Sequence, residues 1–299
     1  MKNISVCIPT YYGSHSLVES VSSIRTSKNG ADVTIIVALD GKPLEASIKK
    51  ALLNLKVQLI ENTDNKGQMA RIKQMIELVK TPITVLTQDD ILFEDTTLTM
   101  IAESFAKHQT ITMIGALELP TPAKLFIEKV VATGISVARY IGKNWNGGDN
   151  YLMASGRCLA FRTDFLRTLE LPEKIINSDA YLYFATKQKG GVFSACTNAV
   201  VRNPAPQTIA EHLKQAQRFS ISQKENEYYL NASLQTEYAL PLLLEIRALL
   251  RSLLLQPFYT VLYLLLETYS HWYNAQQKFT LTGTWQTDVS TKRAKKVHA

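Results

Sequence analysis

The sequence predicts an α/β fold built on a mostly parallel central sheet, and two observations support this fold class. In the first third of the chain, short apolar runs rich in β-branched residues alternate with segments of helical periodicity. Such alternation is typical of βαβ units, in which a helix joins two parallel strands. The composition agrees, because 46% apolar and 20% charged residues in a chain of 299 exclude a disordered chain and a membrane protein with many spanning helices.

Strands are expected where these apolar runs are bounded by turn residues. Five lie in the first part of the chain, at Ile4–Ile8, Val33–Ala38, Val57–Ile60, Ile83–Leu86 and Ile111–Leu117. A further short strand is expected later, at Gly156–Phe161.

Helices are expected between and after the strands. The segment Gln68–Val79 places its apolar side chains on one face, at the 3.6-residue period of a helix packed on a sheet. A second helix is expected at Asp95–Lys107, with Asp95 capping its first turn. Later helices are expected at Ser178–Lys189 and from Thr208 to about Phe219.

The segment 120–150 has no clear pattern. Its loop Asn146–Asn150 contains two glycines, and it either closes over a ligand or is a plain surface connection.

Residues 239–275 are expected to form a separate helical region. The longest stretch without a charge, Ser252–Leu266, has 15 residues, whereas a spanning helix needs about 20, so a single span is not expected. Pro257 is expected to divide this region into two amphipathic helices. They lie in a membrane interface, pack on the domain, or contact a second copy or a membrane protein.

The net charge of +7 is concentrated in a tail. Residues 276–299 hold five basic residues and one acid, so they carry +4 and the rest of the chain +3. A basic tail on a nearly neutral body argues against nucleic acid as a partner, and lipid headgroups are a better match for the tail. The expected organisation is therefore a domain at 1–220, a helical region at 221–275 and the tail.

The cysteines and the N-terminus indicate a reducing compartment. Cys7, Cys158 and Cys196 are widely spaced and odd in number, so neither a disulfide framework nor a zinc site is expected. Met1 leads almost directly into the first strand, without the pattern of a signal peptide. The expected location is the cytoplasm, at the inner face of the membrane.

Unusual residues follow three of the predicted parallel strands, at Pro9–Gly13, Asp40–Pro43 and Thr87–Asp90. Each segment alone is compatible with an ordinary turn. In parallel sheets, however, ligands bind beyond the carboxyl ends of the strands. Three such segments at one sheet edge therefore predict a ligand site there.

Seven segments carry a family resemblance. They are Val6–Tyr11, Ile35–Gly41, Asn65–Arg71, Val85–Asp90, Gly156–Arg162, Ser178–Asp179 and Gln215–Phe219. In this order and at these spacings, the sequence resembles the family 2 glycosyltransferases, which have the GT-A fold and invert the anomeric centre. The resemblance covers about residues 4–220.

The resemblance implies a divalent metal site at the end of the fourth predicted strand. Asp89 and Asp90 stand where the family's DxD-type motif makes its metal and ribose contacts, and Mg²⁺ or Mn²⁺ suits such oxygen ligands. Either Thr87 or Gln88 stands where the family has its first acid, depending on the register. Both registers leave a carboxylate for the metal.

The resemblance also implies a nucleotide pocket. Pro9, Thr10 and Tyr11 would shape the base and ribose pocket, and Asp40 would bind the base, commonly uracil. Further along the chain the implied pocket residues are Asn65, Gly67 and Arg71. Gly67 would allow close approach of the backbone. The arginine would stabilise the pocket or pair with a phosphate, unless it is a solvated helix residue.

Inversion requires a base that removes the proton of the acceptor hydroxyl. Asp179, preceded by Ser178, stands at the family's place for this base, although it is also placed to cap its helix. Gln215, Arg218 and Phe219 resemble the Gln-x-x-Arg-Trp motif, with Phe in place of Trp. In that motif the arginine contacts the donor diphosphate and the aromatic ring holds the acceptor sugar.

The function that the resemblance implies is therefore inverting transfer from a nucleotide-diphosphate sugar, commonly UDP-linked in the family, to a glycan or lipid-linked acceptor. Two alternatives stay open. A nucleotidyltransferase would bear a Gly-rich basic loop after the first strand, which Tyr11–His15 resembles poorly. A degenerate GT-A domain that scaffolds a glycosyltransferase complex would explain the missing acid of the DxD-type motif.

Overall fold

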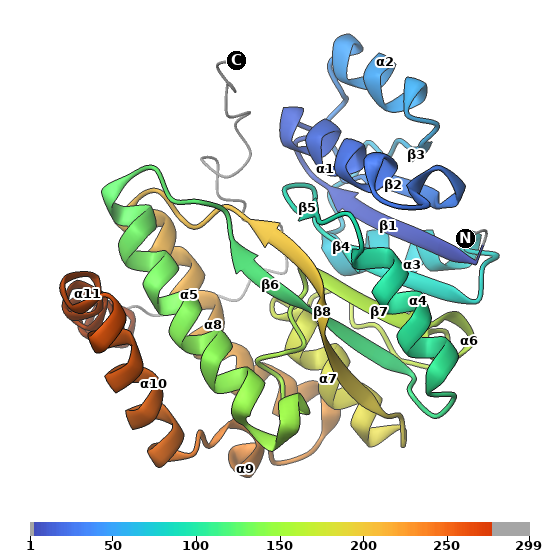
Figure 1. The fold of residues 1–299 in the computed structure, drawn as a ribbon. Helices are drawn as coiled ribbons and strands as arrows, with labels where there is room; N and C mark the ends of the chain where they lie inside the picture. The colour runs from blue at the N-terminus through green and yellow to red at the C-terminus, as the bar shows by residue number, and fades with distance from the viewer. Residues whose placement is uncertain (1–2, 277–299) are drawn as a thin grey trace.

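The computed structural model describes residues 3–276 and has the predicted α/β architecture (Figure 1). Its strands, in chain order, are β1 Ile4–Thr10, β2 Thr34–Leu39, β3 Gln58–Ile60, β4 Ile83–Thr87, β5 Leu92–Phe93, β6 Met113–Pro120, β7 Cys158–Arg162 and β8 Phe193–Asn203. All six strands expected from the sequence are present. The two that the sequence did not reveal are β5 and β8.

Within the described residues these strands form one sheet, in the order β3-β2-β1-β4-β7-β6-β8-β5. The pairs β1–β2, β1–β4, β2–β3 and β6–β8 are parallel. The exceptions are β7, which runs antiparallel to β4 and β6, and β5, which runs antiparallel to β8. The carboxyl ends of β1, β2, β4, β6 and β8 therefore share one edge of the sheet.

The helices are α1 His15–Thr26, α2 Ala46–Asn54, α3 Gln68–Leu78, α4 Thr97–Lys107, α5 Phe126–Asn144, α6 Thr163–Leu166, α7 Ser178–Gln188, α8 Ile209–Leu230, α9 Gln235–Tyr238, α10 Leu242–Leu255 and α11 Pro257–Gln276, with 3-10 turns η1 Gly30–Asp32 and η2 Asn146–Gly148. The expected helices correspond to α3, α4, α7 and α8, and α8 continues well beyond its expected end. The predicted cap of α4 is wrong, because Asp95 instead accepts a hydrogen bond from the main-chain N–H of Lys28.

Both faces of the sheet are covered by helices, which is why β1, β2 and β4 are continuous apolar runs. On β1, Val6 and Ile8 pack in the cluster that includes α1, α2 and α4, whereas Cys7 packs in the cluster that includes α3, α6 and α7. Burial raises the pKa of the Cys7 thiol to about 12, so this thiol is unreactive. As expected, all three cysteines are free.

The C-terminal helices α10 and α11 pack on α5, beside the sheet (Figure 1). A side chain at Gly134 of α5 would collide with the ring of Tyr263, which shows how closely α11 approaches. The division at Pro257 is confirmed, because α10 ends at Leu255 and α11 begins at the proline. No helix in residues 3–276 is long and apolar enough to cross a membrane. The predicted basic tail lies outside the described residues, apart from residue 276.

Candidate active site at the carboxyl edge of the sheet

Thr10, the last residue of β1, joins the three strand ends that the sequence singled out. Its hydroxyl donates a 2.5 Å hydrogen bond to Oδ2 of Asp89, which follows β4. Its main-chain oxygen accepts the N–H of Asp40, which follows β2, at 2.9 Å. The same hydroxyl accepts the N–H of Gly13 at 3.0 Å. The predicted gathering of these segments at one sheet edge is therefore present.

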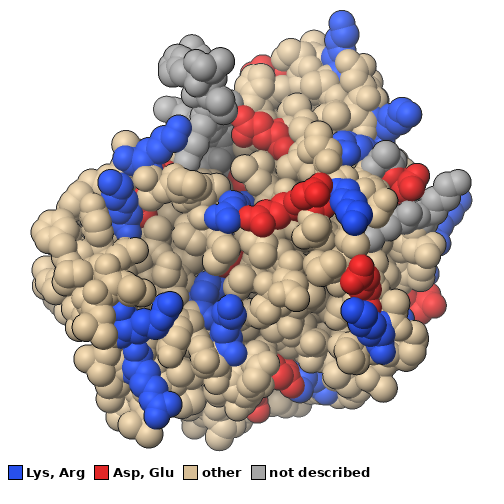
Figure 2. Space-filling model, viewed as in Figure 1, with Lys and Arg blue, Asp and Glu red and all other residues tan. Residues whose placement is uncertain are grey.

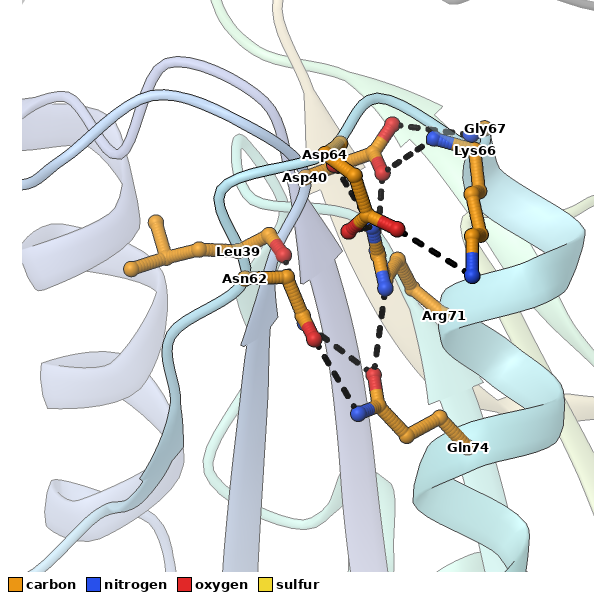
Figure 3. Close-up of polar contacts among 8 residues, drawn as sticks. All are labelled: Leu39, Asp40, Asn62, Asp64, Lys66, Gly67, Arg71 and Gln74. Carbon is orange, nitrogen blue, oxygen red and sulfur yellow. Dashed lines mark hydrogen bonds and ion pairs between the residues drawn. The ribbon is translucent and has the colours of Figure 1, made fainter.

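Asp40 lies fully buried and holds the loop that precedes α3 (Figure 3). Its Oδ1 accepts the N–H of Lys66 at 3.0 Å and Nε of Arg71 at 2.7 Å. Its Oδ2 accepts the N–H of Gly67 at 2.9 Å. The contact with the nucleotide base that the sequence predicts for Asp40 stays a prediction, and what the structure shows is that this carboxylate holds the loop before α3.

Arg71 is buried, with 4% of its side chain exposed, so it is not a solvated helix residue. Besides Asp40, it binds the side chain and the main-chain oxygen of Asp64, at 2.5 and 2.6 Å. Hydrogen bonds from Arg71 and Lys66 hold the pKa of Asp64 below its ordinary value. These contacts favour the pocket-stabilising role of the arginine over direct pairing with a phosphate.

Asn62 and Gln74 complete this loop, and sequence reasoning did not find them. Asn62 donates to the main-chain oxygen of Leu39 at 2.9 Å and exchanges hydrogen bonds with Gln74 (Figure 3). Gln74 lies one turn after Arg71 on the same face of α3, and this spacing was the one available signal.

The remaining predicted pocket residues surround this edge. Pro9 is buried on β1, beside Ala38 of β2. Tyr11 is half-buried, and the ammonium group of Lys42 lies 5.5 Å from its ring centroid. Asn65 is exposed on the loop before α3. Gly67 has a φ of 92°, which an L-residue rarely adopts, so the loop requires glycine there.

Asp89 is buried and Asp90 is partly exposed, directly beyond the end of β4. Within the described part of the chain, no three His, Cys, Asp or Glu side chains form a metal cluster. The two adjacent carboxylates still fit Mg²⁺, which proteins commonly hold through one or two carboxylates together with water and substrate phosphates. Thr87 is buried, and its hydroxyl donates a 2.5 Å hydrogen bond to the main-chain oxygen of Arg157.

Asp179 is the second residue of α7, and its carboxylate contacts the loop before β7. Its Oδ2 accepts the N–H of Gly156 at 2.9 Å. The residue at the N-cap of α7 is Asn177, and no side chain caps this helix end. Capping is therefore not what Asp179 does, and its carboxylate is directed to the same loop that Thr87 binds.

Glu118 of β6 holds the loop before β7 in place through Ser155 and Arg157. It is buried, accepts the hydroxyl of Ser155 at 2.6 Å, and lies within 3.8 Å of Arg139 and 3.5 Å of Arg157. Burial acts to raise the pKa of Glu118, but the two arginines and hydrogen bonds hold it below its ordinary value. Gly156 thus lies between two residues that one buried carboxylate binds. No sequence signal marked this glutamate.

Glu225 of α8 holds the segment directly before Asp179, at the start of α7. It accepts the main-chain N–H groups of Ile176 and Asn177 at 2.8 and 3.0 Å, directly before α7. The amide of Asn177 also donates to the hydroxyl of Ser222 at 2.7 Å. Burial raises the pKa of Glu225, while the two N–H groups oppose this shift. The start of α7 is therefore fixed by buried hydrogen bonds from α8.

The predicted residues Gln215, Arg218 and Phe219 lie on α8, one to two turns before Ser222. Arg218 shares the face of Ser222 and Glu225, since residues four and seven positions apart align on a helix. Phe219 is 53% exposed. The structure thus brings this segment to the helix that holds the start of α7.

Comparisons with known proteins identify the family of this chain. A model of the family described as glycosyltransferase like family 2 matches residues 2–221. The chain belongs to this family. A comparison with curated protein sequences finds no match.

This family 2 glycosyltransferase has the GT-A fold of solved glycosyltransferase structures. A mannosyltransferase from Pyrobaculum calidifontis, in complex with GDP-Man and Mn²⁺, aligns with 93% of this chain and 76% of its own at a TM-score of 0.59 and 14% identity. Glucosyl-3-phosphoglycerate synthase from Mycobacterium tuberculosis was solved in complex with phosphoglyceric acid. The alignment covers 74% of this chain and 77% of the synthase, at a TM-score of 0.51 and 13% identity. Of the alternatives that the sequence left open, family membership disfavours the nucleotidyltransferase.

Proposed function

We propose that this family 2 glycosyltransferase inverts the anomeric centre by direct displacement, with Asp179 as the base. The observation that carries the proposal is the position of Asp179. Its carboxylate binds Gly156 in the loop before β7, and the next residue of that loop, Arg157, binds Thr87, two residues before Asp89. The acceptor oxygen forms a bond to the anomeric carbon as the bond to the diphosphate oxygen breaks. The acceptor proton passes to Asp179, and the nucleoside diphosphate leaves.

The donor is a nucleotide-diphosphate sugar, and we propose a UDP-linked one. In this proposal the end of β1, with Pro9, Thr10 and Tyr11, forms one side of the nucleotide pocket, and the loop before α3 forms the other. Support comes from the hydrogen bonds by which Asp40 and Arg71 hold that loop beside the end of β1. The mannosyltransferase neighbour was solved with GDP-Man, so a guanosine donor belongs in the same screen.

We propose that Asp89 and Asp90 hold a Mg²⁺ or Mn²⁺ ion, as the Mn²⁺ in the mannosyltransferase neighbour suggests for this fold. Bound there, the ion would neutralise charge on the departing diphosphate. The hydroxyl of Thr10 donates a hydrogen bond to the carboxylate of Asp89 and so fixes the orientation of this carboxylate beside the end of β1.

The acceptor is a glycan or a lipid-linked sugar. Arg218 lies on α8 one turn before Ser222 and two turns before Glu225, which fix the start of α7, and we propose that its guanidinium contacts the donor diphosphate. The exposed ring of Phe219 offers an apolar face on which a sugar can stack.

We further propose that α10 and α11 rest on a membrane surface at the cytoplasmic side. Large apolar side chains on these helices are exposed, among them Leu243, Leu254 and Leu265 at 72%, 86% and 63%. In Figure 2 the face over α5, α10 and α11 is mostly tan with scattered Lys and Arg, and acidic side chains lie mainly to its right. Apolar side chains beside basic ones suit an anionic lipid surface.

A screen of UDP-, GDP- and other nucleotide sugars for metal-dependent donor hydrolysis tests the enzymatic proposal. We expect nucleoside diphosphate release with one donor, and a loss of about 100-fold or more in Asp179→Asn. Asp164→Asn is the matched control, because that side chain is fully exposed far from the loop of Gly156. Nucleotide binding without turnover of any donor or acceptor would instead favour the scaffold alternative.

A further inference from the structure

A groove lies where the turn between α10 and α11 meets the carboxyl ends of β6 and β8. It encloses about 640 Å³. One wall is polar and cationic, with Lys129 and Thr133 of α5 and Arg202 of β8, and the other is formed by Leu255, Gln256 and Phe258. Among the residues proposed for catalysis or donor binding, none lines this groove within the described part of the chain.

The two walls differ in chemistry. Lys129 is exposed, and Arg202 uses Nε and Nη2 to bind one oxygen of Glu94, both at 2.7 Å. A guanidinium has five N–H donors, so this ion pair orients the arginine without using all of them. Opposite these cations, Leu255 and Phe258 are 64% and 61% exposed. This lining suits a ligand that carries both an anionic group and an apolar chain.

The apolar wall continues into the exposed face of the C-terminal helices. Leu254 precedes Leu255 on α10, and Val261 lies almost one turn after Phe258 on α11, both exposed. Exposed apolar side chains of the C-terminal helices therefore adjoin the lining of the groove. The turn is fixed from the α5 side by a 3.0 Å hydrogen bond from Thr133 to Gln256.

The groove also has a fixed relation to the candidate active site. The strand β6 lies two positions from β4 in the sheet, which corresponds to about 10 Å at the usual strand spacing. Both strands end at the same edge, so Pro120 of the groove and Asp89 lie on one side of the molecule. Arg202 lies on β8, three positions from β4, so the groove and the candidate active site share this edge of the sheet.

We propose that this groove binds the lipid phosphate of the acceptor, with the phosphate at Lys129 and Arg202 and the hydrocarbon chain against Leu255 and Phe258. This inference rests on the proposed function, and it narrows the acceptor class from glycans in general to sugars or hydroxyls carried on a lipid phosphate.

The test uses the full chain and a short soluble probe, farnesyl phosphate, with farnesol and inorganic phosphate as partial ligands. Isothermal titration should give the phosphorylated lipid an affinity at least about tenfold higher than either partial ligand, since both walls contribute. Lys129→Glu and Phe258→Gln should each weaken the probe about tenfold, while Lys143→Glu and Leu53→Gln, outside the groove, should change it less than about twofold.

Three results would overturn the proposal. If farnesol binds as tightly as farnesyl phosphate, the groove recognises only the hydrocarbon chain. If inorganic phosphate binds as tightly as farnesyl phosphate, the groove recognises only the anion. An unchanged affinity in Lys129→Glu, with an unchanged melting temperature, would place the lipid elsewhere. Donor hydrolysis by the wild-type chain, measured without any lipid, reports separately on the proposed function.

Discussion

The main-chain N–H of Gly156 donates a 2.9 Å hydrogen bond to Oδ2 of Asp179. This bond connects the loop before β7 with the start of α7, and it leaves one carboxylate oxygen of the candidate base outside the contact. The loop is held in turn by Glu118 through Ser155 and Arg157, and by Thr87 through the oxygen of Arg157. The orientation of the base therefore depends on residues of two strands, β4 and β6, and of the loop before β7.

Gly156→Ala should lower kcat with a small change in the KM of the donor. A Cβ at this position would lie 3.0 Å from both Cγ and Oδ2 of Asp179, so the carboxylate must move. A displacement of this kind costs about 10- to 100-fold in rate. Steady-state kinetics with the identified donor and acceptor measure the effect. Gly190→Ala is the control for backbone strain alone, because its φ of 76° disfavours alanine while no atom lies within 4 Å of its Cβ position. It should lower stability without lowering kcat, and an equal kcat in the two variants would contradict the assignment.

Asp40→Asn should destabilise the protein by about 3–5 kcal/mol, because it removes the buried carboxylate that pairs with the guanidinium of Arg71 and leaves this buried cation only the partly exposed Asp64. Urea denaturation, followed by circular dichroism, measures the free energy of unfolding. Asp64→Asn removes the partly exposed partner of the same arginine and should shift the midpoint much less. Similar midpoints for the two variants would show that Asp40 does not anchor the loop before α3.

Glu118 should make the free energy of unfolding depend on pH. Its pKa is lowered in the folded state, so it contributes stability above the ordinary pKa of glutamate and loses it as the pH falls through the lowered value. The urea midpoint of the wild type should therefore fall more steeply between about pH 5 and pH 3 than that of Glu118→Gln. At pH 7 the variant should be the less stable protein, since Arg139 and Arg157 lose their shared carboxylate. Parallel pH profiles would refute this account.

The parts of the fold that the sequence predicted are those whose own pattern decides the structure. The strands β1, β2 and β4 are apolar on both faces, and α3 carries a clear apolar stripe. By contrast, β8 has exposed polar residues at Thr197 and Asn198, and its pairing with β6 shifts register after Ala116. The helix α5 contains two glycines and several β-branched residues, and its packing against α10 and α11 determines its conformation.

The same distinction holds in the candidate site. Asp40, Arg71 and Asp179 lie in segments with a family pattern, and these residues were expected. Glu118 and Glu225 were not, because each acts through main-chain N–H groups or arginines far away in the sequence. Such partners are brought together only by the packing of the sheet and α8, and no local spacing encodes them.

Asp90→Asn should raise the Mn²⁺ concentration for half-maximal donor hydrolysis by about tenfold or more, because it removes one of two adjacent carboxylates from the proposed metal site. Titration of the metal-free protein with Mn²⁺ and Mg²⁺ gives this concentration directly. Asp95→Asn, an exposed position at the start of the next helix, is the control and should match the wild type. An unchanged metal requirement in Asp90→Asn would assign the ion to Asp89 alone.

The exposed face of α10 and α11 predicts binding to vesicles that contain anionic lipid. Replacing Leu254 and Leu265 together with Gln removes two side chains that are 86% and 63% exposed, so folding should be unaffected while membrane affinity falls about tenfold or more. Co-sedimentation with vesicles of phosphatidylglycerol and phosphatidylcholine measures this affinity. Leu53→Gln on α2 is the matched control, because its side chain is 54% exposed on another part of the surface. If the double variant still sediments like the wild type, the apolar face does not contact the bilayer, and a second protein becomes the better occupant.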